Sequence, residues 1–247
     1  MTATEVDITG FRSVRDLHLP LRRLTVLVGA NGVGKTNLYR ALELLHAAAI
    51  GTLADEIALE GGLGAIFWAG GRNLTKDGHL DPAYRADGYR RGEGPARLKL
   101  GISLELDDFS PRYAIEIGFP DRKTSAAFAL EAQVKAERLD FAERGKRVVL
   151  LERNGAAAWR RDAEGRRQPI DEPLLASEVA LANLAGTPEI DAVRQSLAAW
   201  RFFHGFRTDR GSPLRAPCRA VTAPLLAADG SNLAAVFATL RHIRQET

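Results

Sequence analysis

The segment GANGVGKT, residues 29–36, constrains the fold of this chain more than any other part of the sequence. It matches the pattern G-x-x-x-x-G-K-[ST], in which glycines let the backbone fold back and point its N–H groups at a phosphate. The apolar run 24–28 before it predicts a strand, and the apolar spacing after it, at Leu38, Ala41 and Leu45, predicts a helix. A strand, a glycine loop and a helix in this order predict a phosphate-binding loop.

The side chains of this loop predict how a nucleoside triphosphate would be held. Lys35 would place its charge on the β- and γ-phosphates, and the Thr36 hydroxyl would be a ligand of Mg²⁺. We therefore predict ATP and Mg²⁺ as the ligands of the chain. The predicted nucleotide-binding residues of the loop are Gly29, Ala30, Asn31, Gly32, Val33, Gly34, Lys35, Thr36 and Asn37.

The composition is that of an ordinary globular protein. The chain has 247 residues, 45% of them hydrophobic, which is enough for one large domain or two small ones. No apolar run approaches the ~18 residues of a membrane span, and the first residues lack the basic and apolar regions of a secretory signal. Cys218 is the single cysteine, so disulfides cannot be part of the design. These features predict a cytoplasmic protein with no membrane partner.

The rest of the pattern predicts an α/β fold that includes an antiparallel sheet. Two strands are expected before the glycine loop, at residues 6–11 and 17–21. Alternating apolar residues predict four further strands with one exposed face, at residues 98–106, 113–119, 128–134 and 148–153. The chain is therefore divided into a strand–loop–helix core (1–50), a loop-rich excursion (51–97), an antiparallel β-subdomain (98–153) and a mainly helical segment (154–247).

Two helices are expected in the last third of the chain. Thr187 and Pro188 are typical of a helix start, and Ile190, Val193, Leu197 and Trp200 follow on one face. A final helix would be capped by Asp229 or Ser231. Its apolar stripe, expected to pack into a core, consists of Leu233, Val236, Phe237, Leu240 and Ile243.

Several segments resemble P-loop ATPases of the ABC type, in particular those similar to RecF, SMC and OLD (overcoming-lysogenization-defect) proteins. The opening strand, the sequence GFRSV and a second strand before the loop are similar to the start of these ATPases. The segments EGGLGAIFWAG, WRFFHGFRTDRGSPLR and LLAADGSNLAAVFATLRHI resemble the group labelled AAA family ATPase (AAA_21).

This resemblance implies an ABC-type ATPase head that hydrolyses ATP on forming a homodimer, in DNA repair, recombination, or phage and plasmid defence. It also implies that Arg12 contacts the nucleotide phosphates, although a salt-bridged or solvated surface arginine is the alternative. DNA is a candidate partner, with phosphate contacts from Arg85, Arg90, Arg91 and Arg97. A solvated surface excursion is the alternative for these four arginines. A small-molecule kinase has less support, because no segment resembles an acceptor-substrate lid. A GTPase has still less, because Thr75-Lys76-Asp77 only half-matches a guanine-binding motif.

Hydrolysis by an ATPase of this class also needs two carboxylates, one for Mg²⁺ and one for the attacking water, together with a Ser-x-Gly signature. No serine of the chain is followed two positions later by glycine, and no glutamine lies between Lys35 and Leu98. The sequence IDEP at 170–173 follows polar residues, whereas a buried parallel strand would be continuously apolar. Glu105 belongs to an alternating, half-exposed strand. The catalytic residues are therefore left unassigned.

In the resembling ATPases the missing motifs lie downstream of the segment DGSNL, which begins at Asp229. The chain is therefore expected to be the N-terminal, incomplete part of an ABC-type head, with an antiparallel β-subdomain and a C-terminal helical segment. The alternative is a nucleotide-gated interaction module that binds ATP without hydrolysing it.

Overall fold

The computed structural model describes residues 2–68, 89–90, 94–95, 97–106, 109–120, 127–143, 146–171, 173–183 and 187–245. The chain folds into two compact units, residues 1–199 and residues 200–247. The glycine loop and the strands belong to the first unit.

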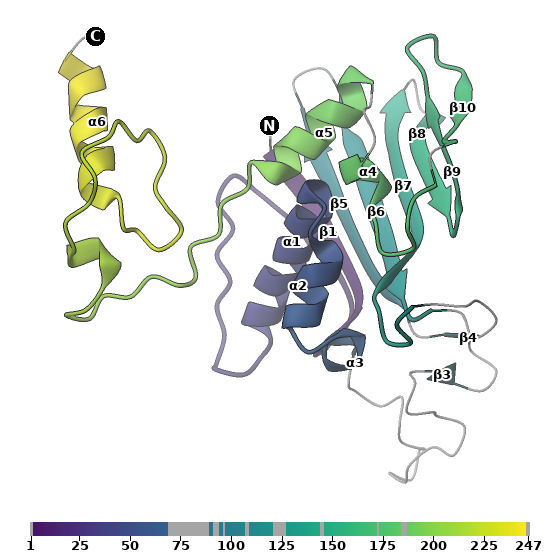
Figure 1. Ribbon diagram of the computed structural model, residues 1–247, viewed down its shortest axis with the longest axis horizontal. Helices are drawn as coiled ribbons and strands as arrows, with labels where there is room; N and C mark the ends of the chain where they lie inside the picture. The colour runs from purple at the N-terminus through teal and green to yellow at the C-terminus, as the bar shows by residue number, and fades with distance from the viewer. Residues whose placement is uncertain are drawn as a thin grey trace, which may run out of the picture. The chain divides into compact units, whose positions relative to one another are not determined.

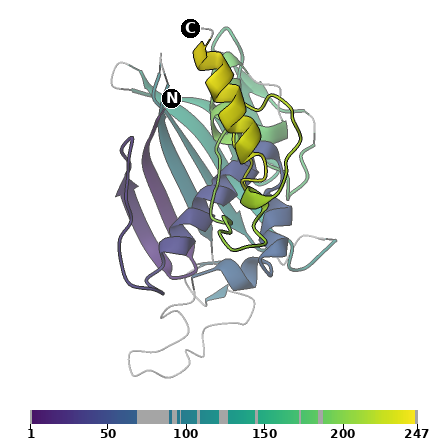
Figure 2. The same cartoon turned by 90° about the vertical axis from the view of Figure 1, so that its left-hand side faces the viewer.

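The first unit is built on an eight-stranded sheet in which every neighbouring pair of strands is antiparallel. The strand order is β10-β9-β8-β7-β6-β5-β1-β2, which places β2 at one edge and β10 at the other (Figures 1 and 2). The strands are β1 (Thr2–Phe11), β2 (Val14–Pro20), β5 (Leu98–Glu105), β6 (Pro111–Gly118), β7 (Gln133–Glu143), β8 (Lys146–Asn154), β9 (Ala157–Arg161) and β10 (Arg167–Pro169). A separate two-stranded ribbon pairs β3 (Tyr89–Arg90) with β4 (Gly94–Pro95). The expected antiparallel sheet is confirmed.

The register of the sheet shows why its inner face is a core. Five residues face one another in turn across β1, β5, β6, β7 and β8, and each of them is 0% exposed. They are Val6, Ile102, Tyr113, Leu139 and Leu151. Because side chains alternate along a strand, the residues that flank Val6 on β1 and Tyr113 on β6 face outward. One row of five apolar or aromatic side chains thus holds the central strands in register.

Five helices accompany the sheet in the described part of the first unit (Figure 1). Of these, α1 packs against α2, α4, α5 and the strands β1 and β5, and Ala41, Leu44 and Leu45 are buried in it. Figure 2 shows α1 crossing the face of the sheet beside β1. The helices are α1 (Lys35–Ile50), α2 (Leu53–Leu59), α3 (Leu63–Ile66), α4 (Ala180–Asn183) and α5 (Pro188–Ala198). The helices expected after the glycine loop and after Thr187 are confirmed.

The start of the predicted excursion is instead helical and buried. Leu53 and Ile57 of α2 and Leu63 and Ile66 of α3 are at most 2% exposed. Glycines at the ends of these short helices interrupt the apolar spacing, which is why the sequence pattern did not predict them. Most of the remaining excursion, up to residue 97, lies outside the described residues.

Two further expectations about strands are corrected. The run around Phe128 and Leu130 is a turn, and these two residues are 69% and 70% exposed. The strand begins only at Gln133, because β6 ends at Gly118 and offers no partner beyond that pair. In the segment expected to be mainly helical, β9 and β10 extend the sheet, and their arginine-rich sequences lack the apolar alternation that predicts a strand.

The second unit consists of loops, a short 3₁₀ turn η1 (Pro213–Arg215) and the helix α6 (Leu233–Gln245). Ala235, Val236 and Thr239 of α6 are buried, and the Thr239 hydroxyl accepts a 2.9 Å hydrogen bond from the Ala223 N–H. Phe237 and Ile243 are more than half exposed, so most of the predicted stripe does not pack into a core within this unit. Among the described residues, no helix is long and apolar enough to cross a membrane.

Candidate nucleotide-binding site

The glycine loop has the backbone conformation that its sequence predicts. Gly32 and Gly34 have φ angles of 86° and 98°, a region that residues with a side chain rarely adopt. Gly34 is the N-cap of α1, and its carbonyl oxygen accepts a 3.0 Å hydrogen bond from the Asn37 N–H. A Cβ on Gly29 would lie 3.0 Å from the Val33 side chain, so the loop closes tightly there as well.

Lys35 folds back over this loop. Its Nζ donates 2.7 Å hydrogen bonds to the carbonyl oxygens of both Gly29 and Ala30. Among the described residues no carboxylate forms an ion pair with Lys35, so its charge is balanced only by backbone dipoles. The ammonium group is therefore available to an anion that enters the loop.

The donor groups gathered here fit a triphosphate with its Mg²⁺. The loop leads into the N-terminus of the 16-residue helix α1, and the first turn of that helix contains no acidic residue. A helix N-terminus with free N–H groups favours an anion. Thr36 lies exposed in this first turn, where its hydroxyl could reach a cation bound to the phosphates.

The turn between β1 and β2 is packed directly against the glycine loop. The Ser13 Oγ accepts a 2.8 Å hydrogen bond from the Asn37 side-chain amide. A Cβ on Gly34 would lie 2.7 Å from the same Ser13 oxygen. The glycine at position 34 is thus required twice, for its φ angle and for its contact with the turn.

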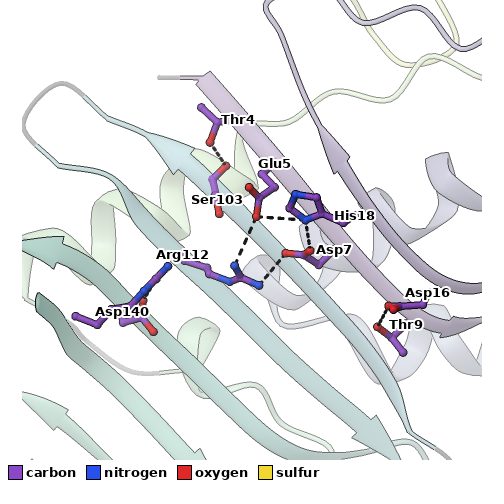
Figure 3. A network of polar contacts seen from close by, with 10 residues as sticks. Thr4, Glu5, Asp7, Thr9, Asp16, His18, Ser103, Arg112 and Asp140 are labelled. Atoms are coloured by element: carbon purple, nitrogen blue, oxygen red, sulfur yellow. Dashed lines mark hydrogen bonds and ion pairs between the residues drawn. The ribbon is translucent and has the colours of Figure 1, made fainter. Parts of the chain in front are cut away.

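An open cavity of about 560 Å³ lies between the start of β2 and the glycine loop. Residues 13–17 line one side of it, and residues 26–28 and 33–35 together with Leu38 line the other. Its charged lining residues are Arg15, Asp16 and Lys35. The Asp16 carboxylate accepts a 2.9 Å hydrogen bond from the Thr9 hydroxyl (Figure 3).

Arg12 lies in the same turn but is already paired. Its guanidinium forms an ion pair and hydrogen bond with Glu60 at the end of α2. The Arg12 N–H donates a 2.8 Å hydrogen bond to the Ile66 carbonyl, and its φ angle is 46°. The phosphate contact that the resemblance implies for Arg12 stays a prediction.

The expected strand at residues 24–28 is not formed. Leu24, Val26 and Val28 are 80%, 70% and 90% exposed, and no described strand pairs with this run. A parallel strand rich in valine and leucine is stable when other strands and helices cover it on both sides. The described sheet instead ends at β2, so the run lacks the neighbours that would make it a strand.

The acidic and basic candidates from the sequence lie elsewhere or outside the described residues. Asp171 is exposed just beyond β10, at the opposite edge of the sheet from β2, and Glu105 is the exposed last residue of β5. Arg97 packs against Gly118. The structure describes no side chain for four of these candidates, which are Arg85, Arg90, Arg91 and Glu172.

Two polar clusters were not anticipated from the sequence. One is buried: the Glu137 carboxylate, 1% exposed, accepts hydrogen bonds from the N–H groups of Ala180 and Leu181 and from the Tyr113 hydroxyl. Burial raises the pKa of Glu137 against the effect of these hydrogen bonds. Glu137 and its neighbour Arg153 occupy inward positions, where alternation predicts apolar side chains, so the pattern held no signal for them.

The other cluster lies on the outer face of β1 and β2 (Figure 3). The potential ligand atoms of Glu5, Asp7 and His18 all lie within 4.8 Å of one another. The Arg112 guanidinium donates a 2.8 Å hydrogen bond to Asp7 and lies 3.5 Å from Glu5. The two carboxylates are therefore already balanced by Arg112, and this cluster is best described as an ion-pair network.

Comparison with known proteins supports the expected ATPase resemblance. Residues 1–62 match the AAA ATPase domain family (AAA_15), a region that covers β1, β2, the glycine loop and α1. An OLD nuclease of Thermus scotoductus (strain ATCC 700910 / SA-01) is 45% identical to this chain over 40 residues. That alignment covers 16% of this chain and 8% of the nuclease. The similarity supports an ATP-related function of the ATPase class, and the family match includes the glycine loop.

Proposed function

We propose that this chain binds ATP through the glycine loop, with Lys35 and the backbone of residues 29–34 holding the phosphates. The observation that carries the proposal is the position of the Lys35 ammonium. It lies over the loop, held by two backbone carbonyls and by no carboxylate of the described chain. A triphosphate would offer this ammonium negatively charged acceptors in place of neutral ones, and the attraction between opposite charges would add to the hydrogen bonds.

Each residue of the site has a distinct proposed part. Gly32 and Gly34 allow the loop to turn its N–H groups inward, and α1 adds the positive end of its dipole. The Thr36 hydroxyl is the proposed ligand of Mg²⁺, which would neutralise phosphate charge when bound. Asn37 holds the loop against the β1–β2 turn through Ser13.

We further propose that the chain is the N-terminal part of an ABC-type head with a P-loop fold, and that hydrolysis requires dimerisation. The likeness of residues 1–62 to ATPases supports this. The alternative is a nucleotide-gated interaction module without hydrolysis. It is favoured by one observation: Asp171 and Glu105, the described carboxylates considered for catalysis, do not line the cavity at the glycine loop.

DNA is the proposed macromolecular partner, and the cytoplasm is the proposed location. The similarity to a protein named a nuclease supports the first, and the lone Cys218 is in keeping with the second. The proposal of a DNA partner assigns no DNA-contacting residue among the described residues.

Substituting Lys35 by alanine tests the proposed ATP site. Hydrogen bonds to charged groups are worth ~1.5–3 kcal/mol, so ATP affinity should fall about tenfold or more. The measurement is calorimetric titration of wild type and Lys35→Ala with ATP and Mg²⁺. Lys99→Ala is the matched control, because Lys99 pairs with Glu116 on the outer face of the sheet. Equal affinities of wild type and Lys35→Ala would contradict the assignment.

A further inference from the structure

The two arginines of the β1–β2 region have different surroundings, and the difference bears on which of them can meet a nucleotide. Arg12 is bound to Glu60, whose carboxylate also lies 3.7 Å from Arg40. If Arg12 moved away, the Glu60 side chain, which is only 14% exposed, would keep only the more distant Arg40 as a nearby cation. Arg12 is therefore a structural link between the β1–β2 turn and the end of α2.

Arg15 has no such partner. Among the described residues no carboxylate forms an ion pair with it, and its guanidinium lies over the Trp68 ring at 5.5 Å from the centroid. The side chain is exposed, and a cation–π contact at an exposed site is weak. An anion can thus recruit Arg15 without breaking an ion pair.

Arg15 also lines the same cavity as Lys35. The cavity lies between the start of β2 and the glycine loop, and the Ser13–Asn37 hydrogen bond holds these two walls together. The one acidic lining residue, Asp16, already accepts a hydrogen bond from Thr9. Two cations and a single carboxylate leave the charged lining with a positive excess.

We infer that Arg15, rather than Arg12, is the second cation of the nucleotide site and contacts the phosphates of the nucleotide. This inference rests on the proposed ATP binding by the glycine loop. A triphosphate carries several negative charges, and Lys35 compensates only one of them. A guanidinium offers planar paired donors that match phosphate oxygens, which a lysine cannot supply. Arg15 is a binding and specificity-determining residue for the polyphosphate.

The test is calorimetric titration with ATP and with adenosine of wild type, Arg15→Gln, Arg12→Gln and Arg22→Gln. Losing a hydrogen bond to a charged group predicts that Arg15→Gln binds ATP about tenfold more weakly or worse. Its affinity for adenosine should match that of wild type. Arg12→Gln should keep its ATP affinity within about twofold while melting at a lower temperature, because it loses the Glu60 ion pair. Arg22 is exposed and outside the cavity lining, so Arg22→Gln is the matched control.

Tryptophan fluorescence supplies a second readout that does not depend on affinity. When Arg15 moves from Trp68 to the phosphates, the emission of Trp68 should change, and this change should disappear in Arg15→Gln and in Trp68→Phe. Arg15→Lys also serves if Arg15→Gln does not fold, with an intermediate ATP affinity expected.

The outcomes separate the two claims. Wild-type ATP affinity in Arg15→Gln, or a loss of ATP binding in Arg12→Gln alone, would overturn the assignment of Arg15 and leave the proposed ATP site standing. Failure of the wild-type chain to bind ATP would overturn the proposed function and this inference together.

Discussion

Charged side chains on the outer face of the sheet act mainly on one another. Lys99 and Glu116 pair across β5 and β6 at 2.6 Å, and Arg112 bridges toward Asp7 on β1 (Figure 3). Exposed ion pairs of this kind contribute ~0–1 kcal/mol each to the free energy of unfolding, so they add little to the stability of the fold. Lys35 differs from them because its hydrogen-bond partners are the backbone carbonyls of Gly29 and Ala30, with no ion pair to a carboxylate among the described residues.

His18 gives a prediction at the residue scale. The hydrogen bond that the protonated His18 ring donates to Asp7 and the nearby charge of Glu5 raise the pKa of His18 above its ordinary 6.5. A raised folded-state pKa stabilises the fold fully below 6.5, and this contribution is lost as the pH rises through the higher value. Asp7→Asn should lower the pKa of His18, measured by NMR titration of the imidazole protons.

Lys99→Ala on the same face of the sheet is the control variant, because Lys99 pairs with Glu116 and not with His18. It should leave the raised pKa of His18 as it is in wild type. An unchanged pKa of His18 in Asp7→Asn would show that the Asp7 contact does not hold the protonated ring.

At the scale of elements, the buried cluster around Glu137 connects the sheet to the helices. The Glu137 carboxylate on β7 accepts 2.7 Å hydrogen bonds from the first N–H groups of α4, at Ala180 and Leu181. Arg153 on β8 donates to the carbonyls of Leu175 and Glu178 in the preceding segment. Since α4 and α5 both pack on α1, this cluster helps to place the helix that carries Lys35.

Glu137→Gln is therefore expected to destabilise the first unit. The amide can accept at only one of the two oxygen positions, so an N–H of α4 is left buried without its acceptor, at a cost of ~1–3 kcal/mol. Chemical denaturation would measure this loss in the free energy of unfolding. Glu152→Gln on the neighbouring strand is the control, because Glu152 is 38% exposed and 3.5 Å from Arg138. A loss no larger than that of the control would mean that the buried carboxylate does not hold α4.

For the molecule as a whole, binding and hydrolysis of ATP use different groups. Lys35 and Thr36 belong to the ground-state site, whereas acceleration needs groups that act in the transition state. Neither Asp171 nor Glu105 lies near the glycine loop, since one is at the opposite edge of the sheet and the other ends β5. The proposed site is thus a binding site in the described chain, without an assigned base.

The chain alone is therefore expected to bind ATP without steady-state turnover. Loss of a positioned general base typically lowers the rate of reaction ~10²–10⁴-fold, and no residue of this chain is assigned the role of general base. Phosphate release by the wild-type chain should equal that of Lys35→Ala in a continuous assay. Robust release that Glu172→Gln abolishes would instead identify the IDEP segment as the source of the catalytic carboxylate.

Local sequence was sufficient wherever a backbone conformation or a repeating pattern decides the structure. The glycines of the loop predicted a backbone that folds back on itself, and Gly32 and Gly34 have the positive φ angles that allow it. The apolar spacing after the loop predicted α1, and the alternation in 98–106 and 148–153 predicted β5 and β8. The antiparallel arrangement followed from strands that alternate and succeed one another directly.

Only the tertiary structure decided which groups meet across long stretches of chain. The run 24–28 has the sequence of a buried strand, yet it is exposed because the described sheet ends at β2. Arg12 and Arg15 stand three positions apart, and only their neighbours Glu60 and Trp68 distinguish an ion-paired residue from an available one. Burial of Glu137 likewise depends on α4, which lies 43 residues further along the chain. Propensity and periodicity act over a few residues, whereas these contacts depend on the packing of the whole unit.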